Sequence, residues 1–500
     1  MTYEDVMNLA VRRGLFFPTA EIYPNVPAGF FEFGPEGTKI RNKIIQFWRN
    51  ELVEKEQALE IFGSIILPEI VWKASGHLDN FNDPIVLGSD GTPYRADKLI
   101  EEKINHEIPE GAPIEFFEEK IKELGIVDPK TKKQLGNVQR FNLMMKVEIG
   151  IKGENVGYLR GEACQNIFLN FQRIWKTGRV SLPIGIATTG ESFRNEIAPR
   201  QGLIRKRELT HMDLEIFFNP KKINEFEKFE EIKKYELQLY LLQDKKIHSI
   251  TCQEAVEQKI VSGKLIAYYL ARTQQFFQKM NIPKEKIRFR ELEKEARAFY
   301  SNETWDFEVE TSNGWLELVS CNYRTDYDLK THSIHSKQDL QIKEEGEEEK
   351  FFPHIFEISM GLDRVFLAIV ELNYKKEKRG EEERVFLDFP PNIYPCLLGI
   401  FPLVKKDGLL EKAQEIYENI RKRNFDAVLD EKGSIGKRYA RIDEIGVPYA
   451  VTVDYQTMKD NTITLRERTS MKQKRIPIEA LEEILWNFST GKKTFEDIAE

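Results

Sequence analysis

Two short segments of the sequence combine arginines and acidic side chains at spacings that suit phosphate chemistry. The first, SFRNEIAPRQGLIRKRELTHMDLEIFF, carries Arg194 and Glu196 two residues apart. Alternate residues of a strand face the same side, so a strand here would present this guanidinium and carboxylate together. A loop with proline and glycine follows, and a second strand-like run then predicts an antiparallel hairpin with charge on one side. On this second strand the side chains expected to share a face are Arg205, Leu209, Asp213 and Glu215.

A hairpin of this kind taken alone is also typical of a surface with cross-strand ion pairs. The second segment, PHIFEISMGLDRVFLAIVEL, favours a binding site instead. A strand with Glu357 and Ser359 leads through Gly361 into an apolar helix whose first turn holds Asp363 and Arg364. An arginine at this end opposes the helix dipole and calls for a compensating anion, and a nucleotide phosphate would serve. For this segment alone, a surface pair between Arg364 and Asp363 remains the alternative.

The elements that must position these segments are predicted from the apolar pattern. An amphipathic helix is expected over 38–56, followed by an apolar strand-like run that ends at Pro68. After 390, strands alternate with helices as in a compact α/β domain of about a hundred residues. We expect catalytic-domain segments at 1–81, 141–218 and 296–375, an insertion at 82–140, a helical insertion at 219–295, a charged linker at 376–389 and a C-terminal domain at 390–500.

The composition is that of a large globular protein with more than one domain. The 500 residues are 41% hydrophobic and 31% charged. A net charge of -8 gives no support for an RNA partner, although a local basic face suffices for transient binding. Four scattered cysteines without a CxxC pair argue against a structural zinc site and a disulfide framework. No apolar run reaches the length of a membrane span, so we expect a cytoplasmic protein with no membrane partner.

Together the two segments resemble motifs 2 and 3 of the class II aminoacyl-tRNA synthetases. Motif 2 has the pattern FRxE, a loop, then RxxxFxxx(D/E), and motif 3 ends in Gly-x-(D/E)-Arg at a helix start. The stretch that ends at Pro68 looks like motif 1. Over nearly its whole length the chain is similar to the glycyl-tRNA synthetases of the archaeal and eukaryotic dimeric type. The stretches that carry this resemblance include GFFEFGPEG, SGHLDNF, YLRGEACQNIFLNFQRIW, YSNETWD, GWLELVSCNYRTDYDLKTH and GSIGKRYARIDEIGVPYAVTVDYQTMKDNTITLRER.

The resemblance implies an α+β fold and a two-step reaction. We expect an antiparallel sheet of six to eight strands flanked by helices, with helical insertions, a C-terminal α/β anticodon-binding domain and a homodimer formed through motif 1. The amino-acid carboxylate attacks the α-phosphate of ATP, and the terminal ribose of tRNA(Gly) then attacks the adenylate. No enzyme nucleophile is required, so catalysis consists of positioning and of neutralising the charge that builds at the α-phosphate.

By resemblance, the ATP site is formed by arginines and two carboxylates. Arg194 contacts the α-phosphate and the substrate carboxylate, and Glu196 contacts the adenine amino group. Arg205 and Arg364 hold the outer phosphates, for which the planar guanidinium fork is well suited. Glu317 would bind Mg²⁺ between the phosphates, since magnesium takes oxygen ligands and few carboxylates.

The glycine site implied by the resemblance holds the ammonium group by carboxylates and excludes bulk. Glu162, Asp213 and Glu357 match the three ammonium ligands of the family, with Ser359 beside them and Arg324 near the substrate carboxylate. A methyl group forced into a filled pocket would clash, so no editing domain is required.

Some positions depart from the pattern of the family. Leu209 stands where a phenylalanine stacks on adenine, and leucine offers no π-face. Asp213 is one methylene shorter than the usual glutamate, and Gly161 replaces a proline. These changes are expected to modulate activity and not to abolish it, because every phosphate-binding arginine is present.

Alternative interpretations remain open. A non-catalytic synthetase-like protein that binds nucleic acid, such as a polymerase accessory subunit, would tend to lose the ATP arginines, which this chain keeps. A class II synthetase for serine, proline or threonine is disfavoured by the three ammonium-binding acids. His332 and His335 are a weak candidate metal pair, and we expect no zinc. The basic side chains expected to face RNA in the C-terminal domain are Lys437, Arg438 and Arg441.

Overall fold

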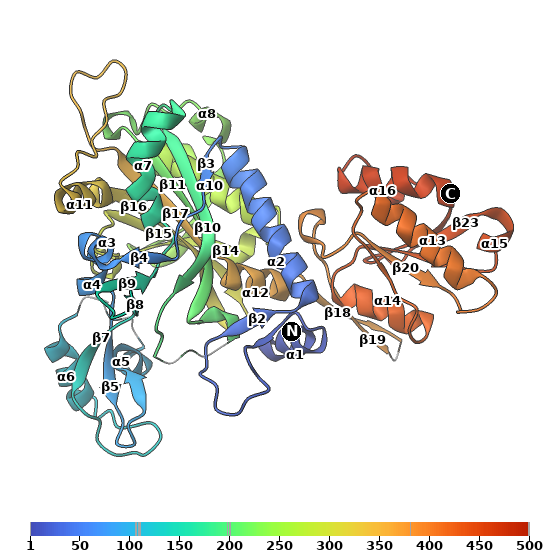
Figure 1. Ribbon diagram of the computed structural model, residues 1–500, viewed down its shortest axis with the longest axis horizontal. Coiled ribbons are helices and arrows are strands. Elements are labelled where there is room, and N and C mark those ends of the chain that lie inside the picture. Colours follow the sequence, from blue (N-terminus) through green and yellow to red (C-terminus); the bar gives the residue numbers. More distant parts are fainter. Residues whose placement is uncertain are drawn as a thin grey trace.

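A long, twisted sheet runs through the body of the molecule and carries both segments identified above (Figure 1). The computed structural model describes residues 2–105, 108, 112–197, 199, 202–380 and 382–498. Within these residues the sheet has nine strands. In sheet order they are β13 (Lys246–Thr251), β12 (Glu236–Leu241), β14 (Ile287–Glu291), β15 (Glu303–Thr311), β16 (Gly314–Thr325), β17 (His354–Gly361), β11 (Glu208–Phe218), β10 (Ile184–Phe193) and β3 (Leu59–Ile61).

The predicted antiparallel sheet is confirmed, but the expected six to eight strands are too few. Most neighbouring strands are antiparallel, and only β12–β14 and β10–β3 run parallel. The additional strands β12, β13 and β14 come from 219–295, which we expected to be a helical insertion. That segment also forms α8 (Phe229–Ile232), α9 (Cys252–Glu257) and α10 (Lys264–Gln278). The charged composition of 219–295 led to the prediction of helices. An edge strand such as β13 exposes charged side chains much as a surface helix does, so composition does not distinguish the two.

Helices cover both faces of the sheet. On one face lie α2 (Pro35–Trp48) and its π-helical continuation (Arg49–Glu54), α10 and α12 (Leu362–Leu372), which share the largest apolar core with the sheet. α1 (Tyr3–Arg12) and the short strands β1 (Phe16–Pro18) and β2 (Phe31–Phe33) complete that side. On the other face α7 (Gln165–Gly178) and α11 (Tyr327–Ser336) enclose a smaller core. This second face is apolar at one end only. Its other end carries polar side chains.

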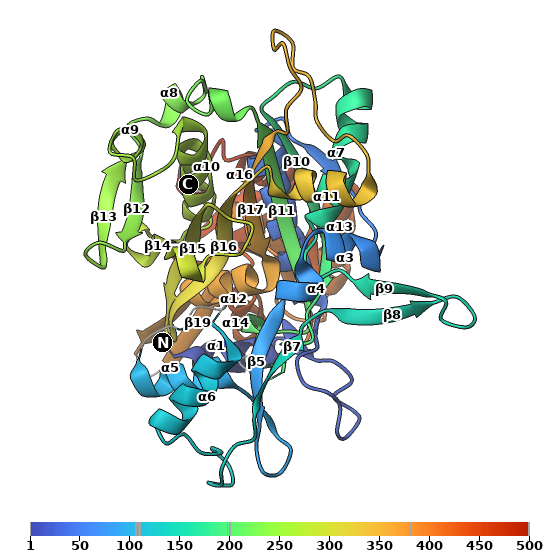
Figure 2. The ribbon, with the colours of Figure 1, turned by 90° about the vertical axis from the view of Figure 1, so that its left-hand side faces the viewer.

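Two smaller sheets project from this body (Figure 2). One module has its own core and consists of β5 (Asn82–Leu87), β6 (Pro93–Arg95), α5 (Ala96–Ile104), α6 (Ile114–Glu123) and β7 (Val138–Asn142). The other is a hairpin of β8 (Met145–Ile149) and β9 (Asn155–Leu159), to which β4 (Ile66–Pro68) adds a strand. Between β4 and β5, α3 (Glu69–Ala74) and α4 (His77–Asn80) approach the polar end of the main sheet.

The C-terminal part forms a separate α/β unit with its own core. Its five-stranded sheet has the order β21 (Ala427–Leu429), β20 (Leu398–Pro402), β22 (Tyr449–Val453), β23 (Thr462–Glu467) and β24 (Gln473–Pro477). The packed helices are α13 (Leu409–Lys422), α14 (Ile435–Glu444), α15 (Thr457–Asp460) and α16 (Leu481–Ser489). The segment expected to be a solvated linker forms instead a hairpin of β18 (Tyr374–Arg379) and β19 (Glu382–Leu387). Cross-strand pairing explains how so charged a run becomes ordered.

Candidate active site

Two adjacent central strands place acidic and hydroxyl side chains side by side on the polar end of the sheet. β11 and β17 pair so that Asp213 lies opposite Ser359 and Glu215 lies opposite Glu357. Directly opposed residues of antiparallel strands share a face, so all four side chains project to the same side. The Ser359 hydroxyl donates a hydrogen bond of 2.6 Å to one carboxylate oxygen of Asp213. The predicted glycine-site residues of both strands therefore come together.

Arg324 is engaged entirely by protein carboxylates in this pocket. Its side chain is fully buried and donates two hydrogen bonds to Asp328, of 2.7 and 2.8 Å, and one of 3.0 Å to Glu357. The guanidinium carbon lies 3.6 Å from the centre of the Tyr300 ring. In the free protein Asp328, in the first turn of α11, holds both arms of the Arg324 fork, and Arg324 also contacts Glu357. The predicted place of Arg324 near a substrate carboxylate stays a prediction.

Glu162 approaches the same pocket from the loop between β9 and α7. It accepts a hydrogen bond of 2.8 Å from Gln165, lies 3.3 Å from the imidazole of His77 and 3.8 Å from Arg324. Burial alone would raise its pKa, but the charge and hydrogen bond of His77, with the charge of Arg324, lower the pKa of Glu162 well below its usual range. Glu162 is therefore the firmly ionised acid of the pocket.

Asp213 and Glu215 are buried acids with oxygens that have no hydrogen-bond partner. One oxygen of Asp213 and both oxygens of Glu215 lack a partner, as does the hydroxyl of Thr188 opposite Asp213. Burial, and then the negative charge of Glu357, raise the pKa of Asp213 to about 7. The same two causes raise the pKa of Glu215 well above its usual range. Buried polar atoms are normally paired, so these oxygens are available to accept a hydrogen bond from a ligand.

The start of α12 brings Arg364 to the edge of this face. Its guanidinium donates hydrogen bonds of 3.1 Å to the backbone oxygens of Ile204 and Glu317 and lies 3.2 Å from the Glu317 carboxylate. The alternative pair of Arg364 with Asp363 is wrong. Asp363 instead accepts hydrogen bonds from Lys206, at 2.7 Å, and from a backbone N–H of β11. We predicted that Arg364, at the N-terminal end of α12, needs a nearby anion, and in this structure that anion is Glu317.

A β-bulge aims Glu317 toward the site. On strict alternation from Ser320, position 317 would face the opposite side of the sheet. The pairing of β15 with β16 shifts register, so that Phe307 lies opposite Val319 but Glu308 lies opposite Glu317. This restores Glu317 to the polar face, as bulges beside functional sites often do. Two arginines already bind Glu308, which leaves Glu317 as the more available acid for a cation.

Of the remaining residues predicted for ATP, Arg194, Glu196 and Arg205 lie between β10 and β11, outside both strands. We expected Arg194 and Arg205 within the hairpin strands, but β10 ends at Phe193 and β11 begins at Glu208. Arg194 donates a hydrogen bond of 3.2 Å to the Gly161 backbone oxygen, and its guanidinium covers the ring of Phe81 at 5.2 Å. Three residues of this loop, at 198, 200 and 201, lie outside the described residues.

Backbone contacts hold these loops together at the site. Glu196 lies 3.6 Å from Arg205, and the Arg194 backbone N–H donates to the oxygen of Arg207. Since Arg364 contacts Ile204, the loop with Arg205 also reaches the start of α12. Leu209, half-buried, follows on β11. The six residues predicted for ATP therefore form one continuous region that adjoins the acidic pocket through Gly161 and Glu162.

Among the described residues, side-chain atoms of Cys164, Glu215 and Glu357 lie within 4.8 Å of one another, all buried. Burial and the charge of Glu162 raise the pKa of the Cys164 thiol well above its usual value, so this thiol stays protonated and is a poor metal ligand. His332 and His335 are not in this group. The oxygens suited to Mg²⁺ are those of Glu317, with Asp306 near enough that the charge of Glu317 adds to burial in raising the pKa of Asp306.

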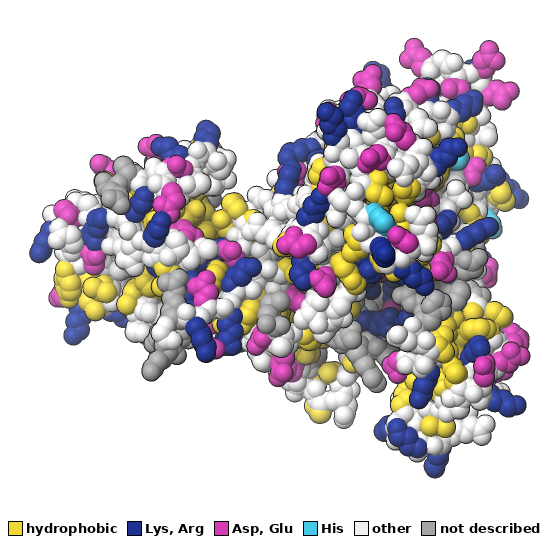
Figure 3. Space-filling view, turned by 180° about the vertical axis from the view of Figure 1, so that it is seen from behind, with side chains coloured by type: hydrophobic (Ala, Val, Ile, Leu, Met, Phe, Trp, Pro, Cys, Tyr) yellow, Lys and Arg dark blue, Asp and Glu magenta, His cyan; other side chains and the backbone are white. Residues whose placement is uncertain are grey.

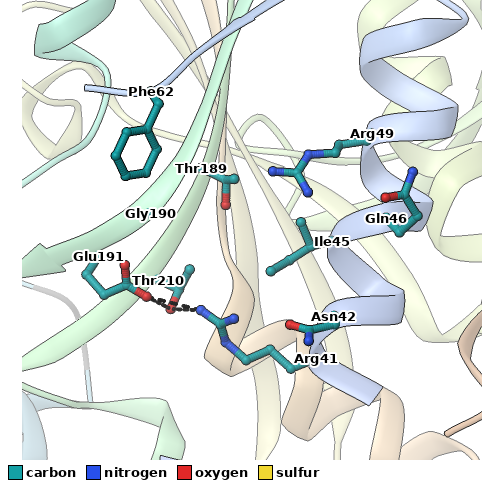
Figure 4. A pocket seen from close by; sticks show the side chains of 10 residues that line it. All are labelled: Arg41, Asn42, Ile45, Gln46, Arg49, Phe62, Thr189, Gly190, Glu191 and Thr210. Carbon is teal, nitrogen blue, oxygen red and sulfur yellow. Dashed lines mark hydrogen bonds and ion pairs between the residues drawn. The ribbon is translucent and has the colours of Figure 1, made fainter. Parts of the chain in front are cut away.

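A separate cavity of about 340 Å³ lies between α2 and β10 (Figure 4). Arg41 crosses it to hydrogen-bond Glu191 and Thr210, at 3.1 and 3.0 Å. Thr210 faces the side of β11 opposite to Asp213, because the two positions differ by an odd number of residues. This cavity is therefore on the other face of the sheet from the acidic pocket and contains none of the predicted site residues.

The three basic residues predicted to face RNA differ in their surroundings. Arg438 is buried and donates hydrogen bonds to the backbone oxygens of Pro402 and Gly433. We therefore remove Arg438 from the RNA-facing set, since it packs within the fold. Arg441 pairs with Asp430 at 2.5 Å, whereas Lys437 is exposed on α14.

Comparison with known proteins agrees with this geometry. Residues 146–373 match the tRNA synthetase class II core domain (G, H, P, S and T), and residues 398–487 match the anticodon binding domain. The glycine–tRNA ligase of Methanocaldococcus jannaschii is 36% identical over 97% of this chain and 98% of its own length. The chain belongs to the glycine–tRNA ligase family. The family enzymes of Pyrococcus furiosus and Methanothrix thermoacetophila are 37% and 34% identical, over 95% and 99% of this chain and over 97% and 98% of their own lengths.

Several residues of this glycine–tRNA ligase family site were missed from sequence. His77 contacts Glu162, Asn322 contacts Glu357 and Asp328 pairs with Arg324, but the three come from separate elements and carry no spacing signal of their own. Glu215 shared the predicted strand face with Asp213, and that periodicity was the signal that could have placed it in the pocket. Lys206 directly follows the predicted Arg205 and donates a hydrogen bond to Asp363, in the first turn of α12.

Proposed function

We propose that the protein is a glycine–tRNA ligase that activates glycine with ATP and transfers it to the 3′ end of tRNA(Gly). One observation carries the choice of amino acid. A buried carboxylate oxygen of Asp213 that accepts no hydrogen bond, and that lies 3.8 Å from the imidazole of His211, is on the face where Glu357 and Ser359 project. The loop with Glu162 approaches the same place. Such an oxygen suits an ammonium group. Because the side chains around it are buried, we expect a larger substrate side chain to clash with them.

The arginines at the other end of the site suit the phosphates of ATP. Arg194 donates a hydrogen bond to Gly161, next to Glu162, and this supports a role for its guanidinium between the two substrates. Arg205 and Arg364 each contact an acid in the free protein, and phosphate oxygens would replace these partners. Figure 3 shows Lys and Arg side chains in the hollow where the small module meets the body. Glu317 would hold Mg²⁺, which supplies charge neutralisation between phosphates when bound.

The reaction follows from positioning by these residues. Asp213, Glu357 and Glu162 hold the ammonium group, and Arg194 orients the glycine carboxylate toward the α-phosphate. The guanidinium of Arg194 then stabilises the negative charge that develops on the α-phosphate as pyrophosphate leaves. No side chain acts as a nucleophile. Zinc is not required by any of these roles.

The test is amino-acid-dependent exchange of pyrophosphate into ATP, with each of the twenty amino acids in turn. Exchange with glycine alone supports the proposal. Exchange with another amino acid would overturn the substrate. Absence of exchange with every amino acid, including after addition of tRNA, would favour a non-catalytic nucleic-acid-binding protein.

We also propose a homodimer that assembles through the motif 1 region. Large apolar side chains are exposed there, including Phe62, which is 90% exposed, and Ile70, which is 53% exposed. Exposed apolar clusters commonly mark protein interfaces. Light scattering should give twice the mass of the chain, and Phe62→Asp should shift the mass toward the monomer.

The anticodon-binding domain and Lys437 support tRNA(Gly) as the second substrate. Lys437→Ala should raise the KM for tRNA about threefold, and less at higher salt. Glycine-dependent exchange should not change. In the described part of the chain every helix is too short or too polar to cross a bilayer. A cytoplasmic location stays a prediction.

A further inference from the structure

Glu215 is a buried acid in the amino-acid pocket to which the mechanism above gives no role. Its side chain has no exposure, and neither carboxylate oxygen has a hydrogen-bond partner. An ionised carboxylate in such a place is strongly disfavoured unless it is paired, and it then takes up a proton. A strand position that only needed to fill space would carry an apolar side chain, as the neighbouring inward position Phe217 does.

The charges around Glu215 are mostly negative. From β17 it faces Glu357, from β11 Asp213, from α11 Asp328, and from β16 the single cation Arg324. The thiol of Cys164, at the start of α7, completes the surroundings within 4.8 Å of the acidic oxygens. Arg324 already pairs with Asp328 and Glu357, so its charge is shared before Glu215 is counted. The empty pocket therefore carries more acids than its cation can neutralise.

We propose that Glu215 is a fourth acid of the amino-acid pocket, which holds a proton while the pocket is empty and releases it when a substrate ammonium group binds beside Glu357 and Asp213. The inference rests on the proposed function, because it requires glycine to bind here. Glu215 does not need to touch the substrate. It acts by supplying a negative charge behind Glu357 only when a positive charge has arrived.

The proton balance of this step is simple. The protonated carboxyl of Glu215 and the ammonium ion of glycine become a carboxylate and a bound ammonium ion, and one proton leaves to solvent. No bond to carbon changes. The step favours a cationic amine over any neutral ligand of the same size. It also avoids a permanent unpaired charge in the core, since the carboxyl is neutral whenever the pocket is empty.

The sign of the pH effect follows from this exchange. Burial and the charge of Glu357 raise the pKa of Glu215 in the empty pocket, whereas the bound ammonium favours the carboxylate and lowers it. Between the two values glycine binding releases a proton, so glycine affinity rises with pH. Ionisation of Asp213 also makes glycine affinity rise with pH, and this rise ends near the Asp213 pKa of about 7. Glu215 adds to the total number of protons released.

The first experiment counts protons by calorimetric titration of glycine into the full-length protein in buffers of different ionisation enthalpy. Glu215→Gln keeps the shape of the side chain but cannot ionise. The wild type should release about one proton more per site than this variant. Glu303→Gln is the matched control, because Glu303 is a buried acid on the neighbouring region of the sheet that hydrogen-bonds Ser262 and Trp305. It should release as many protons as the wild type.

The second experiment observes the proton directly and needs no variant to fold. Infrared difference spectra of the wild type, with ¹³C-labelled glutamate, should lose a protonated-carboxyl band when glycine is added. Glycolate, which lacks the amine, should not remove the band. Equal proton release by the wild type and Glu215→Gln, or a band that glycine leaves unchanged, would overturn the inference while the function stands.

Two further outcomes distinguish a failure of glycine binding from neutralisation of Glu215 by a metal ion. Failure of glycine to bind the wild type at all would overturn the proposed function together with the inference. A stoichiometric metal found by elemental analysis, and lost in Cys164→Ala, would show that a cation and not a proton neutralises Glu215. That result would overturn the inference alone, since glycine activation could still be measured.

Discussion

The two ends of the active site differ in how their charges are held before any substrate binds. At the glycine end, Arg324, Asp328 and Glu357 are buried and joined by hydrogen bonds of 2.7 to 3.0 Å. At the ATP end, Arg364 and Glu317 remain 32% and 43% exposed and lie 3.2 Å apart. One end is part of the core, and the other is a surface whose ion pairs water can replace.

This difference corresponds to what each substrate requires. Glycine has no side chain for the protein to contact, so discrimination against larger amino acids depends on a rigid binding site. Buried, close-packed side chains provide this rigidity. ATP brings its own charge and a metal ion, so its site needs arginines that can exchange partners at small cost. Surface ion pairs contribute little stability, which makes this exchange easy. Substitutions should therefore affect catalysis alone at the ATP end, but catalysis and stability together at the glycine end.

The largest effect is expected for Arg194→Ala, at the junction of the two ends. Loss of the guanidinium removes the donor that stabilises charge at the α-phosphate, and glycine-dependent kcat/KM for pyrophosphate exchange should fall by about 10² to 10³. The melting temperature should change little, because Arg194 is only half-buried. Arg194→Lys, which keeps the charge but not the fork, should recover only part of the rate. A large loss of stability would contradict the proposed contrast.

Asp213→Asn should raise the KM for glycine by about 10- to 100-fold, because the amide cannot pair with the ammonium. With a pKa of about 7, Asp213 is ionised only above neutral pH, so wild-type glycine affinity should fall as pH drops below 7. The variant should show a weaker dependence, with Glu215 still contributing. Between the pKa of Asp213 in the unfolded chain and its raised pKa in the folded protein, the folded protein binds more protons. The free energy of unfolding therefore falls as pH rises through this range, and Asp213 destabilises the fold at high pH.

The same variant therefore has an opposite effect on stability. At pH 8 its melting temperature should rise by roughly a few degrees, and at pH 4 the gain should shrink. Differential scanning calorimetry at both values measures this. A variant that loses glycine binding and also melts lower at pH 8 would argue that Asp213 is structural.

Asp328→Asn should lower the melting temperature by several degrees and reduce kcat/KM for glycine about tenfold. It leaves the buried charge of Arg324 with weaker compensation, and breaking a buried pair is costly. Asp326→Asn is the matched control on the same helix start. Its partner Lys330 is 57% exposed, so both stability and activity should remain near wild type. Equal losses of stability and activity in Asp328→Asn and Asp326→Asn would contradict the proposed difference between buried and exposed ion pairs.

The smallest effect is expected for Leu209→Phe. An aromatic ring at this half-buried position can stack on adenine, and stacking is worth about 0.5 to 1.5 kcal/mol. The KM for ATP should fall about three- to tenfold while the KM for glycine stays unchanged. Kinetics with each substrate varied in turn measures both. A change in the glycine KM would show that the two ends are coupled through β11.

Much of the site could be predicted because its residues lie on regular strands. The alternation of Asp213 with Glu215, and of Glu357 with Ser359, survives in the structure because β11 and β17 are continuous and pair without a shift. The apolar helix after Gly361 was evident from its sequence. Prediction failed where the backbone is irregular, as for Arg205 in a loop, and where charge resembles a helix surface, as in β12 to β14.

The sequence by itself determined the arginines, the acids, and the strands and apolar helix of the two central segments, because these depend on residue type and on local periodicity. Only the tertiary structure decided which charges are already paired. It joined Arg324 to Asp328, buried Arg438 in the C-terminal domain, and used a bulge to return Glu317 to the polar face. It also left Glu215 without a partner. Partners and burial depend on contacts between distant segments, and no spacing along one chain records them.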